Sequence, residues 1–167
     1  MSKGNGKRSR WRWGVEVLAV IAVLLAIQAW QTRGAVSGPA PPLPPAGINA
    51  ETPAADQQQG PRLVHFWAEW CPVCRFEEDQ INALARDHAV MTVALASGDD
   101  GAVRRYLQEH QLEFPVVNDE TGALAERWGV EGVPTSFVID EDGQVRFVTR
   151  GYTTSWGLRA RLWWAGL

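Results

Sequence analysis

Residues 66 to 77, FWAEWCPVCRFE, decide the fold of this chain. They contain both cysteines of the protein, Cys71 and Cys74, in the spacing Cys-x-x-Cys. The apolar run from Leu63 to Trp67 predicts a buried strand before the pair, and a helical pattern follows it. A cysteine pair at the boundary between a strand and a helix is typical of a redox-active dithiol.

Cys71 is expected at the N-cap of this helix. Pro72 then occupies the first helical position, where its missing N–H costs no hydrogen bond. The free N–H groups and the positive end of the helix dipole point toward the Cys71 sulfur and favour its thiolate. We therefore expect the pKa of Cys71 to lie below the value of about 8.5 of a free cysteine. Cys71 is the expected nucleophile, and Cys74 is expected to resolve the mixed disulfide.

Other uses of the cysteine pair fit the sequence less well. Closing so short a loop removes little entropy from the unfolded chain, which argues against a structural crosslink. A zinc site needs more ligands, and the three histidines, His65, His88 and His110, are not clustered in the sequence. Two thiolates can hold Cu(I), but no Met-rich or His-rich tract accompanies them. The sequence therefore predicts redox chemistry without a bound metal.

Several short segments resemble one protein family. Residues 66–74, FWAEWCPVC, resemble the active-site stretch of the thioredoxin superfamily. Glu77 is similar to the acid in the WCxxCxxE pattern of membrane-anchored, TlpA-like thiol reductases. Residues 128–135, WGVEGVPT, resemble the family segment WGVxGVPT, whose proline is cis. Residues 137–143, FVIDEDG, resemble the FVIDxxG hairpin that follows it.

A narrower resemblance points to the suppressor-of-copper-sensitivity D proteins, which are protein disulfide oxidoreductases. It depends on WCPVCRFE at residues 70–77, SGDD at residues 97–100 and GYTTSWGL at residues 151–158. The similarity covers residues 62–167. It implies that the redox group is the protein's own cysteine pair and that no cofactor is needed.

The resemblance also implies an α/β fold of the thioredoxin-like type, with a mixed central sheet flanked by helices. Residues 114–130 resemble the strand-helix insertion of the TlpA group. The pattern of the chain predicts strands and helices in alternation, so that the early strands are parallel and the last two form an antiparallel hairpin. The expected strands are 62–67, 90–96, 114–117, 135–139 and 144–149, and the expected helices are 72–88, 101–110, 121–128 and 154–165.

The N-terminal part of the chain predicts a targeting element. Residues 1–12 are a basic tail that should stay in the cytoplasm. Residues 13–30 are apolar and just long enough for a transmembrane signal anchor, which takes about 20 residues. A cleaved signal peptide is the alternative, but residues 26–29, AIQA, make a poor cleavage site. The rest of the chain is then expected in the periplasm, held at a bacterial inner membrane.

Two further regions follow the expected anchor. Residues 31–60 are rich in proline and polar residues and predict an extended spacer, with room for one extra strand at most, near Ile48. Residues 61–167 form the expected thioredoxin-like domain. This domain holds ten Arg and sixteen Asp or Glu residues, so nothing in it indicates a nucleic-acid partner.

Further candidate site residues lie beside the dithiol. The resemblance implies that Pro134 is a cis proline facing the cysteines, and that the backbone of Val133 binds an extended substrate. Glu77 falls one turn after Cys74, where a buried carboxyl group can exchange a proton with it. His65 is either a proton relay or a neutral buried ring, and we expect the buried ring.

Two groups of tryptophans are expected to have structural roles. Trp67 and Trp70 are expected to pack around the dithiol, and Trp70 also to contact substrate. The tryptophans of the last helix are expected in the core; they are Trp156, Trp163 and Trp164.

These features predict a membrane-tethered thiol:disulfide oxidoreductase of the periplasm. Its expected direction is the reduction of protein disulfides, with electrons resupplied by a DsbD-type membrane donor, as the TlpA-like resemblance implies. Oxidation or isomerisation by the same exchange is one alternative. A copper-binding or thiol-buffering accessory without turnover is another, and cytochrome c maturation and copper-stress protection are both candidate client pathways.

Overall fold

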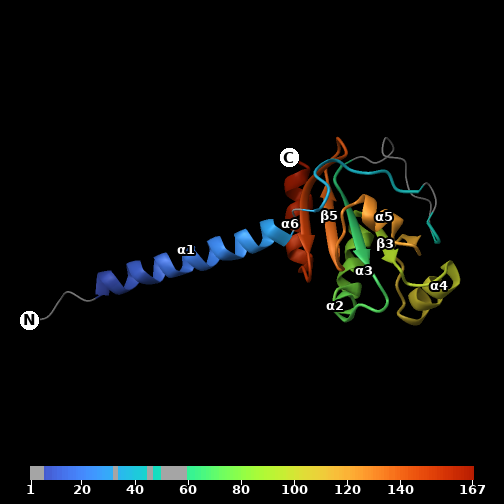
Figure 1. Cartoon of the computed structure of the whole chain (residues 1–167), viewed down its shortest axis with the longest axis horizontal. Helices are drawn as coiled ribbons and strands as arrows, with labels where there is room; N and C mark the ends of the chain where they lie inside the picture. The colour runs from blue at the N-terminus through green and yellow to red at the C-terminus, as the bar shows by residue number, and fades with distance from the viewer. Residues whose placement is uncertain (1–5, 32–33, 45–46, 50–59) are drawn as a thin grey trace, which may run out of the picture. The chain divides into compact units, whose positions relative to one another are not determined.

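The computed structural model describes residues 6–31, 34–44, 47–49 and 60–167, and it separates into the units Met1–Arg33 and Gly34–Leu167. The first unit contains the single long helix α1 (Gly6–Gln31), which includes the apolar stretch expected to be an anchor (Figure 1). Among the residues whose side chains are described, no helix meets both the length and the apolarity needed to cross a membrane.

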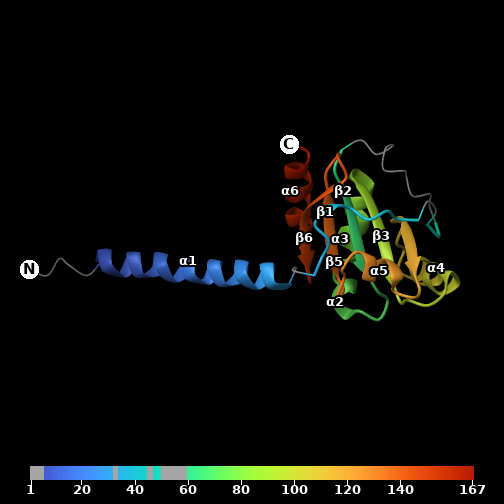
Figure 2. The ribbon, with the colours of Figure 1, turned by 45° about the horizontal axis from the view of Figure 1, so that its top comes forward.

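The second unit is built on a six-stranded sheet with the spatial order β1-β6-β5-β2-β3-β4 (Figure 2). Strands β2, β3 and β4 are parallel to one another, and the pairs β2–β5, β5–β6 and β6–β1 are antiparallel. The expected mixed sheet and the late antiparallel hairpin are therefore confirmed. The strands are β1 (Gly38–Pro39), β2 (Arg62–Trp67), β3 (Ala89–Leu95), β4 (Val116–Asp119), β5 (Thr135–Ile139) and β6 (Gln144–Arg150).

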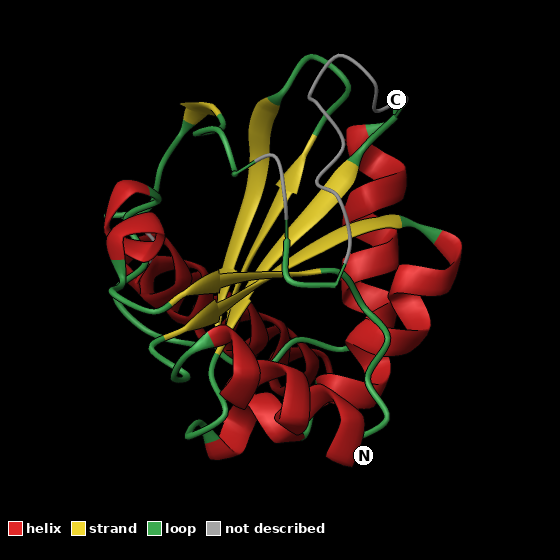
Figure 3. Ribbon diagram, turned by 90° about the vertical axis from the view of Figure 1, so that its right-hand side faces the viewer, coloured by secondary structure: helices red, strands yellow, loops and turns green. Residues whose placement is uncertain are grey.

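Helices flank this twisted sheet, as Figure 3 shows. They are α2 (Pro72–Arg75), α3 (Glu78–Asp87), α4 (Asp100–Glu109), α5 (Ala123–Arg127) and α6 (Ser155–Ala165). The strand-helix unit β4–α5 falls within residues 114–130, where the insertion was expected, and β4 forms one edge of the sheet.

Alternating residues of β2 divide the core into two buried clusters. Leu63 and Trp67 belong to the cluster that contains side chains of α3, α4 and α6. Val64 and Phe66 belong to the second cluster, which contains side chains of α5. Successive residues of a strand point to opposite faces of its sheet, so the unbroken run of buried residues from Leu63 to Trp67 reflects burial on both faces.

The helix expected at 72–88 is in fact two helices. The N–H groups of Cys74, Phe76 and Glu77 each donate to the carbonyl group three residues earlier, and the four-residue spacing resumes at Ile81. Hydrogen bonds of the three-residue spacing tighten the helix. The tight turn separates α2, which carries the cysteines, from α3, and Glu77 lies at the junction.

Part of the expected spacer packs on the domain. Gly38 and Pro39 form the edge strand β1 against β6, and the N–H of Val36 donates to the carbonyl oxygen of Trp128 (3.2 Å). Proline has no N–H to donate, so an edge strand is where a sheet tolerates it. The extra strand therefore lies here and not near Ile48, which donates one hydrogen bond to Val116 at the opposite edge of the sheet.

The prediction that the tryptophans of the last helix are core residues is wrong. Trp156, Trp163 and Trp164 are 81%, 67% and 65% exposed, and the buried positions of α6 are Leu158 and Leu162. Apolar residues occur on both faces of α6, so the sequence alone did not show which face packs against the sheet.

This assignment of the two faces of α6 can be tested by a matched pair of substitutions. Leu162→Ala removes a buried side chain and should lower the free energy of unfolding by about 2–5 kcal/mol. Trp164→Ala removes a larger but exposed side chain and should change it by about 0.5 kcal/mol or less. Urea unfolding of the oxidised protein measures both values. Equal losses in the two variants would contradict the assignment.

Candidate active site

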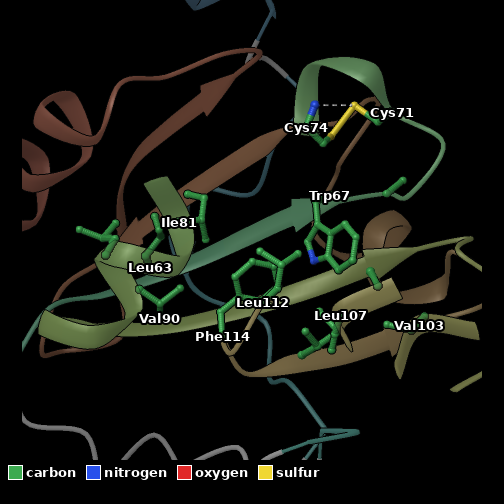
Figure 4. Close-up of a cluster of buried hydrophobic side chains, with 14 of the residues drawn as sticks. Leu63, Trp67, Cys71, Cys74, Ile81, Val90, Val103, Leu107, Leu112 and Phe114 are labelled. Atoms are coloured by element: carbon green, nitrogen blue, oxygen red, sulfur yellow. Dashed lines mark hydrogen bonds between the residues drawn. A yellow bond between two sulfur atoms is a disulfide. The ribbon is translucent and has the colours of Figure 1, made fainter. Parts of the chain in front are cut away.

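The two cysteines form a disulfide at the start of α2. Cys71 is the N-cap residue and Pro72 the first helical residue, as expected. The backbone N–H of Cys74 donates to the Cys71 sulfur over 3.2 Å, which the dashed line in Figure 4 marks. Cys71 is 4% exposed and Cys74 1% exposed. The first cysteine is therefore the more accessible of the two, in the place where helix amides favour a thiolate.

The two tryptophans before the dithiol lie in different environments. Trp67 is buried in the same cluster as the cysteines, and its indole N–H donates to Thr92 Oγ1 (3.1 Å). Figure 4 shows it beneath the disulfide. Trp70 is instead 56% exposed, and its indole N–H donates to the carbonyl oxygen of Ala96 (3.1 Å). Trp67 therefore packs as expected, whereas Trp70 leaves most of its side chain at the surface.

The segment at Val133 and Pro134 lies beside the dithiol although it is about sixty residues away in the chain. The peptide bond between these residues is cis, as the resemblance implied. The Cys71 sulfur lies 3.6 Å from the carbonyl oxygen of Val133. The main chain of Val133 is thus close enough to meet any group that approaches Cys71.

Glu77 is a buried carboxyl group at the junction of α2 and α3. Its side chain is almost fully enclosed, and its backbone N–H donates to the carbonyl oxygen of Cys74 (2.9 Å). The backbone N–H of Thr153 donates to Glu77 Oε1. Burial raises the pKa of Glu77 to about 7, although the hydrogen bond from Thr153 acts in the opposite direction. The carboxyl group can therefore take up or release a proton near neutral pH.

His65 faces Glu77 from strand β2. Its Nε2 lies 4.0 Å from Glu77 Oε2, and its Nδ1 lies 2.9 Å from the hydroxyl oxygen of Ser136. Complete burial lowers the pKa of His65 to about 4. The ring is neutral at neutral pH, in agreement with the expected buried ring, and between about pH 4 and pH 7 the proton of the pair resides on Glu77.

Two contacts of this buried pair were not anticipated from the sequence. Thr153 contributes only a backbone N–H, so no side-chain pattern could reveal its role. Ser136 is an ordinary strand residue whose partner becomes visible only once β5 pairs with β2. Glu78, the first residue of α3, is also buried, and it accepts one hydrogen bond from the Tyr106 hydroxyl group.

This geometry is suited to thiol-disulfide exchange in which the Cys71–Cys74 disulfide is the redox group. Within the part of the chain that the structure describes, no group of three or more His, Cys, Asp or Glu residues is arranged to hold a metal ion. Val133, which precedes the cis bond to Pro134, lies against the Cys71 sulfur of the Cys71–Cys74 disulfide, and Glu77 lies against His65. The indole of Trp70 is hydrogen-bonded to Ala96.

Comparisons with known proteins agree with this chemistry. A family model described as Redoxin matches residues 38–157. A thioredoxin-like protein of Haemophilus influenzae is 40% identical over 109 residues, which cover 65% of each chain. Sporulation thiol-disulfide oxidoreductase A of Bacillus subtilis is 26% identical over 151 residues, which cover 83% of this chain and 92% of that protein.

A solved structure shows the same architecture. A thioredoxin-family thiol:disulfide interchange protein from Chlorobium tepidum superposes with a TM-score of 0.65 at 25% identity, covering 78% of this chain and 97% of that chain. The chain spans slightly less than two thirds of the length of the Haemophilus relative. The family model covers most of the chain and includes the cysteine pair. The chain therefore belongs to the Redoxin family and has a thioredoxin-like fold.

Proposed function

We propose that this protein reduces disulfides of other proteins in the periplasm while tethered to the inner membrane. The observation that carries the proposal is the position of the Cys71 sulfur, which accepts the N–H of Cys74 at the start of α2 and lies 3.6 Å from the main-chain carbonyl oxygen of the half-buried Val133. A nucleophile stabilised in this way can attack the disulfide of an extended protein segment that pairs with the main chain beside it.

The reaction passes two electrons from the dithiol to the partner. The Cys71 thiolate attacks one sulfur of the partner's disulfide, and the other partner sulfur leaves as a thiolate that takes up a proton. The Cys74 thiol then loses its proton, and its thiolate attacks the Cys71 sulfur of the mixed disulfide. The second partner thiol is released, and the enzyme is left with the disulfide seen in the structure.

Glu77 is the proposed proton acceptor for Cys74. It follows Cys74 by one turn and has a pKa of about 7, so its carboxylate can take the proton from the buried thiol near neutral pH. His65 acts through Glu77 as a positioning residue, because its neutral ring lies against the carboxyl group and cannot supply a compensating charge there.

The membrane tether and the electron donor rest on the sequence. Residues 13–30 are rich in apolar residues and follow a basic tail, and this sequence pattern is the ground for the proposed tether. An enzyme that turns over as a reductase in an oxidising compartment needs an external supply of electrons. A DsbD-type thiol donor in the same membrane fits this need, and the resemblance to copper-sensitivity proteins makes copper stress a condition to examine.

A Cys74→Ser variant tests both the exchange and its direction in cells. The variant should accumulate mixed disulfides through Cys71, because no second sulfur displaces the captured partner, and they should sediment with the membranes. Non-reducing gels of acid-quenched cells, with and without copper stress, measure this. In the unchanged protein, the same gels should show a mainly reduced cysteine pair that becomes oxidised when the DsbD-type donor is removed.

Cys71→Ser is the matched control for this trap. It keeps one buried cysteine but lacks the nucleophile, so it should accumulate no mixed disulfide. A persistent disulfide in the unchanged protein would favour the oxidising direction. Tight Cu(I) binding without any mixed disulfide would favour the copper-binding accessory, and recovery of the chain in the soluble fraction would contradict the tether.

The opposed ionisation of Glu77 and His65 predicts a pH signature in stability. Folded Glu77 keeps its proton up to a pKa of about 7, whereas an unfolded carboxyl group loses it at about pH 4.5, so this residue lowers stability as the pH rises between these values. Folded His65 stays neutral down to a pKa of about 4, so it raises stability as the pH rises from there to about 6.5.

As the pH rises from 4.5 to 7.5, the free energy of unfolding of Glu77→Gln should therefore increase relative to that of the unchanged protein, by up to about 3 kcal/mol. The free energy of unfolding of His65→Gln should fall relative to that of the unchanged protein as the pH rises from about 4 to about 6.5. Urea unfolding of the oxidised chain at several pH values measures both differences. Asp79→Asn, at an exposed acid of α3, is the control and should show neither trend. Parallel profiles for all four proteins would contradict the assignment.

A further inference from the structure

The exposed large apolar side chains of the domain are concentrated in two stretches. Within the described part of residues 34–167, all of them fall in residues 70–76, around the dithiol, or in residues 152–167, which include α6. They are Trp70, Val73, Phe76, Tyr152, Trp156, Trp163, Trp164 and Leu167. Large apolar side chains that cluster at the surface of a soluble domain mark interaction sites.

Gln80 joins the two stretches next to the redox site. Its Nε2 donates to the hydroxyl oxygen of Tyr152 (2.9 Å) and to the carbonyl oxygen of Phe76 (3.4 Å). Its Oε1 accepts the backbone N–H of Ser155 (2.9 Å), directly before Trp156. One polar side chain therefore holds together the segments that carry three exposed aromatic residues, and we call Phe76, Tyr152 and Trp156 the aromatic patch.

The aromatic patch is continuous with the catalytic machinery. Phe76 lies between Cys74 and Glu77 in the chain and is 75% exposed, although Cys74 and Glu77 are buried. Tyr152 is 53% exposed and precedes Thr153, whose N–H donates to Glu77. A molecule bound to the patch would therefore contact Phe76, which precedes Glu77. It would also contact Tyr152, which precedes the N–H donor Thr153.

A protein partner is a better occupant of the patch than a lipid surface. The domain carries sixteen acidic residues against ten Arg, and the anionic surface of a membrane repels such a charge. Exchange at Cys71, in contrast, brings a partner protein against α2 in every turnover, and Phe76 is the C-cap residue of this helix. Exposed aromatic residues bury a large area at little cost in conformational entropy, and they dominate binding energy at protein interfaces.

We propose that the aromatic patch is the docking surface for partner proteins whose disulfide is flanked by large apolar side chains. This inference depends on the proposed function, because it assumes that Cys71 attacks the partner's disulfide. The electron balance is that of the exchange described above: the two enzyme thiols become a disulfide, and the partner's disulfide becomes two thiols. The patch selects among partners before the exchange begins.

A pair of synthetic peptides tests this selection. Both contain one intramolecular disulfide, and they differ only in carrying Leu or Ser at the positions that flank the cysteines. The full-length chain is reduced with dithiothreitol, freed of it and mixed with each peptide, and the appearance of peptide thiols gives the two rates. Burial of one apolar side chain should make the Leu peptide react about tenfold faster. Phe76→Ser and Trp156→Ser should each bring this ratio close to one.

Trp164→Ser is the matched control. Trp164 is as exposed as the patch residues but lies eight residues beyond Trp156, about 12 Å along α6, so its loss should leave the rate ratio unchanged. Equal rates for the two peptides in the unchanged protein, or a preference that survives in both patch variants, would overturn the inference and leave the proposed function intact. Failure to reduce either peptide would overturn the proposed function itself.

Discussion

The site depends on one constraint, the pairing of β2 with β5 at the centre of the sheet. Phe66 is paired with Thr135 in this register, so the chain that leaves β2 toward the cysteines meets the chain that enters β5 from Val133. The same pairing places Ser136 opposite His65. Because side chains alternate along a strand, a shift by one residue would turn His65 away from Glu77. The nucleophile, the neighbouring main chain and the buried pair are thus positioned by a single strand register.

A buried carboxyl group beneath a redox pair lowers stability at neutral pH. Burial disfavours the charged form of Glu77, and the neutral ring of His65 brings no positive charge to balance it. The fold accepts this loss of stability at a position where a group that titrates near pH 7 is chemically useful. The amide of Thr153 limits the shift and connects Glu77 to the loop before α6.

The sequence predicted those features that depend on local chemistry or on a long motif. The strand at 62–67, the capping position of Cys71 and the cis bond before Pro134 were all expected and were found. Features that depend on tertiary packing were missed. Two helices replace the single helix expected at 72–88, and a tight turn that contains the buried Glu77 separates them. Apolar residues occur on both faces of α6, so the pattern did not show which face is exposed. The proline-rich residues 31–60 were expected to be only a spacer, because an edge strand as short as Gly38–Pro39 leaves no alternating apolar pattern in the sequence.

The most direct test of this account is the ionisation of the Cys71 thiol. The Cys74→Ser variant isolates it, and the ultraviolet absorbance of the thiolate followed against pH gives its pKa. The amide of residue 74 and the start of α2 should hold this pKa well below the value of about 8.5 of a free cysteine. A thiol that ionises at or above that value would contradict the claim that the helix start activates Cys71.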